Sequence, residues 1–599
     1  MCGISGIITS TGDLSRIYAM NDLISHRGPD GSGFYFGKDF CFGHRRLAII
    51  DISAAGDQPM SYLDRYVIVY NGEVYNHIEL RAELLDLGYS FNSSTDTEVI
   101  IAAYDAWGDK CVERFNGMWA FAIYDKVEKI IFCSRDRFGV KPFYYSHLRG
   151  LFVFGSEIKQ LLSFQPEYRA NKKIVIDFIV SSLSEHTNET FFEGIYALKG
   201  GHNLVFDLER HHFDISRWYF IKHEPSLSNF SDVETLEFYK SKFFSSVDYR
   251  LRSDVLVGTC LSGGIDSSSV AAVAAKKYNG LVDERFKGVH VRSSEIETDE
   301  SSFATIVAQN NDIDLSIITP STEDFVEAID DVVYAQEEPF PDASIFMQYF
   351  VMKKARELGC SVMLDGQGGD ETLLGYERYY PAYLLALPLW QSLKAFFHSC
   401  SNSRLSPKEL LAYCFYFTLW PLRRWRLKRK LGFLKPECFE QTEWLKAVAK
   451  SYLSVNDLQK IEILHTQLPH LLRYEDKNSM AHSIEARLPF LDYRLLEASL
   501  SMDVKHKIKV GWTKYILRKS MEGILPKQVI WRKNKLGFNA PEKTWTEPLK
   551  HQMHADILNS KILSSLCCRE IDLDKLDNRT LWKLYSVAKW EMIYNVVPS

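Results

Sequence analysis

Residues 261–269 have the composition of a phosphate-binding turn. They read Leu261-Ser262-Gly263-Gly264-Ile265-Asp266-Ser267-Ser268-Ser269, and the adjacent glycines let the backbone approach a ligand closely. The backbone N–H groups of such a turn, at the start of a helix, bind phosphate. The usual ATP-binding loop places a lysine after its last glycine, and this loop has none. Because Asp266 would repel a phosphate unless a divalent cation lay between them, we predict a pyrophosphate site that uses Mg²⁺.

A second acidic, glycine-rich turn is the candidate for the opposite wall of this site. Residues 365–371 read Asp365-Gly366-Gln367-Gly368-Gly369-Asp370-Glu371 and follow an apolar run, 361–364, that predicts a strand. Three glycines and three acids make a poor core, whereas Mg²⁺ is commonly held by one or two carboxylates. We therefore predict that Asp266 and Asp370 are the metal ligands. The alternative for 365–371 is a flexible surface turn.

Cys2 is the candidate nucleophile of the first half of the chain. If Met1 is removed, Cys2 carries a thiol and a free α-amine, whose pKa of about 8 lets it act as a base near neutral pH. Further polar clusters follow within 140 residues: 26–31, then Arg45-Arg46 as a basic step into a strand at 47–50, Asn71-Gly72-Glu73 after the strand 66–70, the helix start 94–98, and 135–139.

These motifs, in this order, resemble the class II glutamine amidotransferases with an N-terminal nucleophile. The resemblance runs from Cys2 to about Phe206. It implies an αββα sandwich of the N-terminal-nucleophile hydrolase type, in which the Cys2 thiolate attacks the side-chain amide of glutamine.

The resemblance also implies roles for individual residues. Asn71 and the N–H of Gly72 would form the oxyanion hole, Arg46 would bind the α-carboxylate of glutamine, and Glu73 and Asp96 would hold its α-ammonium. The expected glutamine-binding set is Arg46, Leu47, Ile50, Asn71, Gly72, Glu73 and Asp96.

Several of these residues have ordinary alternatives. Asn71-Gly72 is also typical of a hairpin turn, and Asp96 is also typical of the N-cap region of a helix. The alternative for Arg46 is a surface charge.

The elements that must position these residues form two successive α/β units. In the first half, the pattern predicts strands near 33–37, 66–70, 119–124, 130–134 and 151–154, and helices near 76–87 and 96–107. In the second half, it predicts strands at 254–260, 286–291, 315–318 and 361–364, and helices at 233–250, 270–277, 300–309, 325–333 and 345–358. Strands that alternate with helices indicate a doubly wound parallel sheet with its ligand at the carboxyl ends of the strands.

We expect the boundary between the two units near 208–235. The predicted domains are 2–210 and 235–599.

The Ser-Gly-Gly-Xaa-Asp-Ser loop resembles the signature of the ATP pyrophosphatases. Together with the segment 479–492, it makes nearly the whole chain resemble the glutamine-hydrolysing asparagine synthetases. The family implies that ATP activates a carboxylate as an acyl adenylate, which ammonia tunnelled from the first domain then attacks. Keeping ammonia out of bulk water prevents its loss as ammonium. The expected products are the amide, glutamate, AMP and diphosphate.

The resemblance implies a set of ATP-binding residues and one catalytic lysine. The lysine, Lys535, would neutralise the developing phosphate charge, and its alternative is a solvated basic run. The ATP-binding set is Leu261, Ser262, Gly263, Gly264, Asp266, Ser267, Val291, Asp365 and Gly366.

Two departures from the family pattern concern the acceptor. Many asparagine synthetases have a glutamate where this chain has Gln367, which cannot accept a proton from incoming ammonium, and a serine where it has Asp365. Aspartate is the expected acceptor. The alternatives are another acid, such as a uronic-acid sugar or a secondary metabolite, a non-catalytic sensor of glutamine or nucleotide, and a plain glutaminase, which would leave the second domain without a role.

The composition excludes several other classes. The 599 residues carry a net charge of -6, which gives no indication of a nucleic-acid partner. The eleven cysteines contain no Cys-Xaa-Xaa-Cys pair and indicate neither a zinc site nor a disulfide framework. We expect a cytoplasmic protein, because the N-terminus lacks the pattern of a signal peptide and no apolar run is long enough to span a membrane. The sequence leaves a homodimer open.

The segment 382–430 is aromatic and basic. It is typical of a helical cover with a solvated face, and the alternative is a peripheral contact with an anionic membrane surface or with a large acidic substrate.

Overall fold

Two six-stranded antiparallel sheets form the N-terminal part of the computed structural model, which describes residues 2–10, 12–280, 284–440, 443–533 and 540–599. The first sheet has the order β10-β8-β9-β1-β3-β2 and the second β12-β11-β7-β6-β5-β4. The strands are β1 Gly3–Ile8, β2 Gly31–Phe36, β3 Phe40–Arg46, β4 Met60–Tyr62, β5 Tyr66–Val74, β6 Gly117–Asp125, β7 Ile130–Arg135, β8 Tyr144–Leu148, β9 Leu151–Gly155, β10 Tyr196–Ala197, β11 His202–Asp207 and β12 His212–Arg217.

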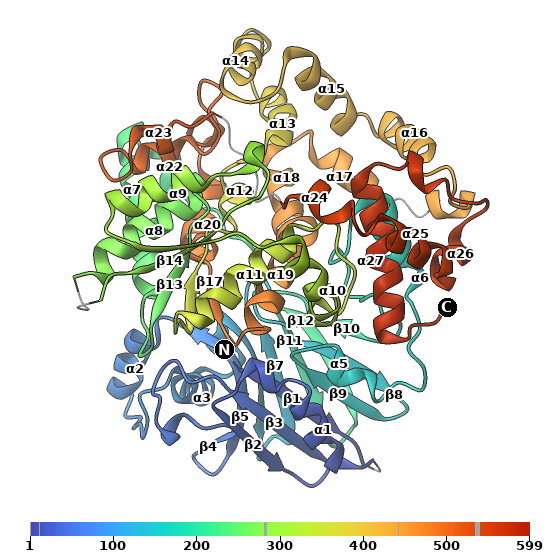
Figure 1. The fold of residues 1–599 in the computed structure, drawn as a ribbon. Helices are drawn as coiled ribbons and strands as arrows, with labels where there is room; N and C mark the ends of the chain where they lie inside the picture. Colours follow the sequence, from blue (N-terminus) through green and yellow to red (C-terminus); the bar gives the residue numbers. More distant parts are fainter. Residues whose placement is uncertain (1, 11, 281–283, 441–442, 534–539) are drawn as a thin grey trace.

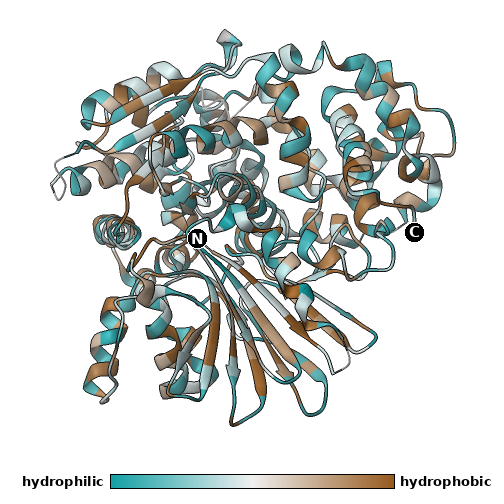
Figure 2. Ribbon diagram, turned by 60° about the horizontal axis from the view of Figure 1, so that its bottom comes forward, coloured by the Kyte–Doolittle hydropathy of each residue, from teal (hydrophilic) through white to brown (hydrophobic). Residues whose placement is uncertain are grey.

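Helices cover both outer faces of this sandwich. Alternate residues of β5 face opposite cores, as the two-residue period of a strand requires: Val67 and Val69 pack between the sheets, and Ile68 and Tyr70 pack toward the helices. Figure 2 shows the apolar residues along these strands. The sandwich is therefore αββα, as predicted. Its helices are α1 Ile17–Asp22, α2 His77–Asp86, α3 Asp96–Trp107, α4 Cys111–Arg114, α5 Lys159–Leu162 and α6 Lys172–Ser181.

A five-stranded parallel sheet organises the C-terminal part, above the sandwich in Figure 1. Its order is β15-β14-β13-β16-β17, so the strand order reverses between β13 and β16, where doubly wound folds bind their ligands. Both faces are covered: Met363 of β16 packs into one core and its neighbours Val362 and Leu364 into the other. The strands are β13 Val257–Cys260, β14 Lys287–Val291, β15 Asp314–Ile318, β16 Val362–Leu364 and β17 Glu485–Arg487.

Helices surround this sheet, and further helices extend the C-terminal part at the upper edge of Figure 1. They are α7 Asp232–Arg250, α8 Ile265–Tyr278, α9 Ser301–Asn310, α10 Thr322–Gln336, α11 Ser344–Glu357, α12 Gly369–Thr372, α13 Tyr380–Leu385, α14 Leu389–Asn402, α15 Pro407–Thr418, α16 Trp420–Lys430, α17 Glu443–Ser451, α18 Val455–Ile461, α19 Leu468–Met480, α20 Tyr493–Ser501, α21 Val504–Lys507, α22 Tyr515–Ser520, α23 Lys527–Ile530, α24 Glu542–Thr546, α25 Lys550–Asn559, α26 Lys561–Leu566 and α27 Asn578–Tyr594.

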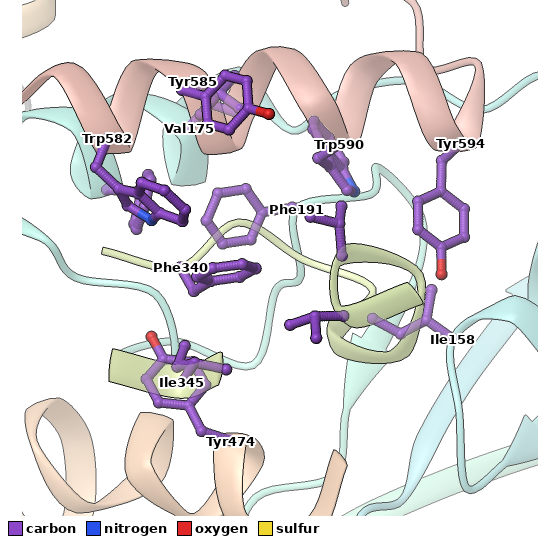
Figure 3. Close-up of a cluster of buried hydrophobic side chains, with 14 of the residues drawn as sticks. Ile158, Val175, Phe191, Phe340, Ile345, Tyr474, Trp582, Tyr585, Trp590 and Tyr594 are labelled. Atoms are coloured by element: carbon purple, nitrogen blue, oxygen red, sulfur yellow. The ribbon is translucent and has the colours of Figure 1, made fainter. Parts of the chain in front are cut away.

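One apolar core joins the two parts. Figure 3 shows Trp582 and Trp590 of α27 in a cluster with Val175 of α6, Phe191 and Phe340. The two parts are therefore packed through a shared core.

The predicted elements are confirmed in kind, but three details differ. The strand predicted after Arg46 is wrong: β3 ends at Arg46, and 47–50 are irregular. Helix α8 begins at Ile265, five residues earlier than predicted, so Asp266 and Ser267 lie in its first turn. Strand β17 was not predicted, because three residues are too few to show a period.

Candidate active sites

A small pocket of about 30 Å³ lies beside Cys2 in the sandwich. We call it the N-terminal pocket. The ends of β3 and β5, the irregular segment after Arg46 and the start of α3 surround it. Its lining includes most of the predicted glutamine-binding set, namely Arg46, Leu47, Ile50, Gly72, Glu73 and Asp96.

Asn71 contacts Cys2 directly. The Cys2 backbone nitrogen donates to Asn71 Oδ1 at 3.2 Å, while Asn71 Nδ2 is buried and has no hydrogen-bond partner among the described residues. A buried donor without a partner is costly, so this amide is suited to an acceptor oxygen brought by a ligand. Burial raises the pKa of the Cys2 thiol, so deprotonation needs a nearby base.

Gly72 lies inside β5, which continues to Val74, so the hairpin-turn alternative for Asn71-Gly72 is wrong. A Cβ atom at Gly72 would lie 2.1 Å from the backbone oxygen of Met118. Only glycine fits this close approach between β5 and β6.

The charged residues of the N-terminal pocket are buried, and Arg46 is not a surface charge. Its guanidinium donates to the Ser53 carbonyl and to Asp57 Oδ1, each at 2.7 Å, which shows that it can bind a carboxylate in this position. The Asp96 carboxylate accepts hydrogen bonds from the Tyr70 hydroxyl at 2.7 Å and the Val74 N–H at 2.9 Å. Thr95, rather than Asp96, caps α3.

Residues from the C-terminal part complete this pocket, and sequence reasoning did not assign them. Glu485 of β17 lines the pocket. Arg487 Nη2 lies 3.3 Å from Glu73 Oε2, although burial still raises the pKa of Glu73. Arg27 donates to the Cys2 carbonyl at 3.2 Å and to Asp476 on α19 at 2.9 Å. In the sequence, the one indication that this region has a functional role was the recognisable motif at 479–492.

The second pocket, of about 280 Å³, lies at the carboxyl ends of β13, β14 and β16. We call it the C-terminal pocket. It brings together both acidic turns, and Gln367 also lines it. The predicted nucleotide-binding and metal residues in its lining are Leu261, Ser262, Gly264, Asp266, Ser267, Val291, Asp365, Gly366 and Asp370.

The turn 261–267 is held by its own serines. Ser262 and Ser267 share a hydrogen bond of 2.8 Å between their hydroxyls, and the Gly264 N–H donates to Ser262 Oγ at 3.3 Å. Gly263, the one predicted nucleotide-binding residue absent from the lining of the described pocket, has φ +78° and backs onto α9. A Cβ there would lie 2.9 Å from the Ala304 nitrogen. Its role is thus to let the turn pack closely.

The two acidic turns meet at Lys514, a residue without any local sequence signal. Its ammonium contacts Asp266 and lies 2.5 Å from Asp370 Oδ1. The two carboxylates therefore converge on one cation, and none of residues 365–371 is exposed as a surface turn would be. No set of three or more His, Cys, Asp or Glu side chains suited to a metal occurs in the described part of the chain. A pair of carboxylates is the donor set expected for Mg²⁺ that is shared with phosphates.

Close packing fixes the position of 365–371. A Cβ at Gly366 would lie 2.7 Å from the Ser267 nitrogen, so the two turns touch through their backbones. Burial raises the pKa of Asp365 to about 6, and the nearby Glu475 on α19 has a pKa raised further by burial and by Asp365. Lys535, the predicted catalytic lysine, lies outside the described residues.

Comparisons with known proteins cover both parts of the chain. The glutamine amidotransferase domain family matches residues 1–219 and the asparagine synthase family matches residues 239–591. The chain is 30% identical to the glutamine-hydrolyzing asparagine synthetase 1 of Bacillus subtilis, over 99% of this chain and 97% of that protein.

Two further relatives cover most of the chain. The glutamine-hydrolyzing asparagine synthetase 3 of Bacillus subtilis is 31% identical over 89% of this chain and 86% of its own. Amidase chry2 of Gibberella zeae is 28% identical over 94% of this chain and 93% of its own. None of the described helices is both long and apolar enough to cross a membrane.

Proposed function

This chain belongs to the glutamine-hydrolysing asparagine synthetase family, and from that premise we propose that it converts L-aspartate, L-glutamine and ATP to L-asparagine, L-glutamate, AMP and diphosphate. The family fixes the general activity, a ligase that takes nitrogen from glutamine. The acceptor, the metal and the roles of individual residues are our proposal.

In the N-terminal pocket, the Cys2 thiolate attacks the amide carbon of glutamine. The tetrahedral oxyanion accepts hydrogen bonds from the unpartnered Asn71 Nδ2 and from the Gly72 N–H. Collapse of this intermediate breaks the C–N bond and releases ammonia, which leaves with the proton that the Cys2 α-amine, exposed by removal of Met1, took from the thiol. Water then hydrolyses the thioester to glutamate. Arg46 holds the α-carboxylate of glutamine, and Glu73 and Asp96 hold its α-ammonium.

In the C-terminal pocket, an oxygen of the acceptor carboxylate attacks the α-phosphorus of ATP and expels diphosphate. Asp266 and Asp370 would hold Mg²⁺, which neutralises the charge of the phosphates. Lys514 contributes a fixed positive charge at the same point. Ammonia then attacks the acyl carbon, and AMP leaves.

The observation that carries this proposal is that one chain contains both pockets. Cys2 faces a buried amide with an unused donor, and Asp266 and Asp370 converge on Lys514. A sensor would need no nucleophile, and a plain glutaminase would need no second pocket.

The test is diphosphate release by the purified chain with glutamine, ATP and Mg²⁺, measured with each of several carboxylic acids. We expect release that depends on the acid and is matched by formation of its amide. A chain that hydrolyses glutamine but releases no diphosphate with any acid contradicts the proposal.

A second acceptor class is favoured by one residue. Gln367 lines the C-terminal pocket, and the family pattern described above has a glutamate at this position, so the surroundings of the acceptor would differ from that pattern. An acid other than aspartate, such as a uronic-acid sugar, is therefore the second candidate.

A further inference from the structure

A side cavity of about 450 Å³ adjoins the C-terminal pocket. The two share four lining residues, Ser344, Ile345, Leu471 and Tyr474. Aspartate has only four carbons and would react beside the α-phosphate, so neither ATP nor aspartate accounts for this additional space.

The lining of the side cavity is predominantly positive. It contains two acids, Asp342 and Glu462, and Glu462 already accepts from Arg378 at 2.8 Å. The basic residues of the lining are Arg378, Arg423, Lys430, Arg579 and Lys583.

Two of these cations have no anionic partner among the described residues, although buried charged groups are usually paired. Arg423 Nε and Nη1 are buried and have no hydrogen-bond partner among the described residues. Lys583 is 6% exposed and, within the described part of the chain, donates only to backbone carbonyls of α6, with Phe178 O at 3.5 Å. Burial, together with the nearby Arg579 and Lys430, lowers the pKa of Lys583 to about 7. An anion in the cavity would relieve this repulsion and supply the missing acceptors.

We propose that the side cavity binds an anionic group of the acceptor, so that the acceptor is a carboxylic acid longer than aspartate that also carries a phosphate or diphosphate. This inference rests on the proposed glutamine- and ATP-dependent amidation and takes the second acceptor class, an acid other than aspartate, as its substrate. The rings of Tyr416, Phe417 and Tyr452 line the same cavity and offer flat apolar surfaces to the body of the acceptor, such as a sugar ring.

The probe is UDP-glucuronate, which joins a carboxylate on a sugar to a diphosphate. We expect it to bind to the wild-type chain in calorimetry and to support diphosphate release better than aspartate does. Arg423→Gln and Lys583→Met should each raise its KM at least tenfold and leave the KM for ATP and the glutaminase rate unchanged. The exposed Lys110 is the control, and Lys110→Gln should behave as wild type.

The outcomes separate the two proposals. Binding that depends on Arg423 without any diphosphate release would support the side cavity and contradict the proposed reaction. Full activity with aspartate, no binding of UDP-glucuronate, and wild-type kinetics in both variants would overturn the side-cavity inference alone.

A different observation concerns the outer surface of α14, α15 and α16, which we call the crest and which runs along the upper edge of Figure 1. Large apolar side chains recur there at four-residue intervals and are exposed, Leu389 by 81% and Trp390 by 62%. The spacing 389, 393, 397 places one set on a single face of α14, and 411, 415 places a second set on a single face of α15. The exposed apolar residues of the crest are Leu389, Trp390, Leu393, Phe397, Leu411, Phe415, Leu419 and Trp425.

The crest is also strongly basic in an acidic protein. Residues 389–430 contain nine lysines and arginines, of which Arg423 and Lys430 line the side cavity, and one acid, Glu409, whereas the whole chain carries -6. Cations lie beside the exposed rings, with Lys394 Nζ 5.6 Å from the Trp390 ring and Arg429 Cζ 5.6 Å from the Trp425 ring. Exposed apolar side chains flanked by Lys and Arg are the pattern of helices that lie on anionic lipid surfaces.

The charge and the apolar stripes together lead us to infer that the crest docks on an anionic bilayer surface. We expect the purified chain to sediment with vesicles that contain 30% phosphatidylglycerol in phosphatidylcholine, and to release them in 0.5 M NaCl. The double variant Leu393→Gln/Phe397→Gln should lose at least tenfold in binding. Val233→Gln, which changes an exposed apolar residue outside the crest, should not.

Two results would overturn this inference. One is the absence of sedimentation with anionic vesicles. The other is a crest that joins two copies of the chain, seen as a dimer in analytical ultracentrifugation that the double variant converts to monomer while vesicle binding is absent.

Discussion

The two pockets differ in how much space they leave for a ligand and in how they are built. The N-terminal pocket has about 30 Å³ and is framed by buried strand residues such as Asn71 and Gly72. The C-terminal pocket has about 280 Å³, is formed by turns after strands, and adjoins a side cavity of about 450 Å³. A narrow pocket framed by buried strand residues suits a single donor, glutamine, whereas loops on a sheet edge allow the acceptor to vary. Variants that impair one half-reaction and spare the other test whether the two pockets work separately.

The largest effect should come from Cys2→Ala. Without its nucleophile, the chain should lose glutamine-dependent amide formation by about 10³-fold or more, while ammonium salts still support synthesis. Amide formation from each nitrogen source provides the measurement. Equal loss with glutamine and with ammonia would show that the two pockets do not work separately.

Asp266→Ala should produce the reverse pattern. Removing one of two carboxylates that converge on Lys514 should lower diphosphate release by about 10²-fold or more and leave glutamine hydrolysis measurable. A diphosphate assay and a glutamate assay on the same preparation test this. Asp314→Ala, which changes a surface-exposed acid on β15, is the matched control. Diphosphate release at the wild-type rate in Asp266→Ala would refute the metal assignment.

Arg487→Met tests whether the C-terminal part serves the N-terminal pocket. The change leaves Glu73 buried without its cation, and breaking such a pair costs about 3–5 kcal/mol. We expect the KM for glutamine to rise at least tenfold and the ammonia-dependent rate to change little. Arg487→Lys should restore part of the affinity. A merely structural role for Arg487 would instead lower both rates together.

The smallest predicted effect concerns Asp365. Burial raises its pKa to about 6, above the value of about 3.9 in an unfolded chain, so the folded state loses stability as the pH rises through this interval. Asp365→Asn should therefore raise the melting temperature by about 1–2 °C at pH 8, and the gain should vanish near pH 4. Scanning fluorimetry across this range measures it. A constant difference at all pH values would argue against ionisation of Asp365 as the cause.

The sequence was informative where chemistry coincides with a local pattern. Cys2, the serine-glycine turn and the acidic turn each carry a recognisable composition next to a strand or helix, and the structure places them in pockets. Lys514 adopts a left-handed backbone conformation just before the short helix α22. The residues around it in the sequence do not indicate a functional role. Its position depends on the tertiary fold, which no local period encodes.

The error at Arg46 has a related cause. Leu47, Ile49 and Ile50 form an apolar run typical of a strand, yet they are irregular and pack against the C-terminal core instead. Burial by a distant part of the chain overrode the local propensity. Lys514 and residues 47–50 are therefore both placed by contacts with distant parts of the chain, which a local pattern does not show.

Glu485 and Arg487 sit on a strand of the parallel sheet, yet they border the pocket of Cys2. A fragment truncated after residue 217 would retain the nucleophile but lose one wall of its pocket and the counter-ion of Glu73. The two parts of the chain therefore cannot be exchanged independently. A sandwich transferred to another synthetase would have to be transferred together with β17.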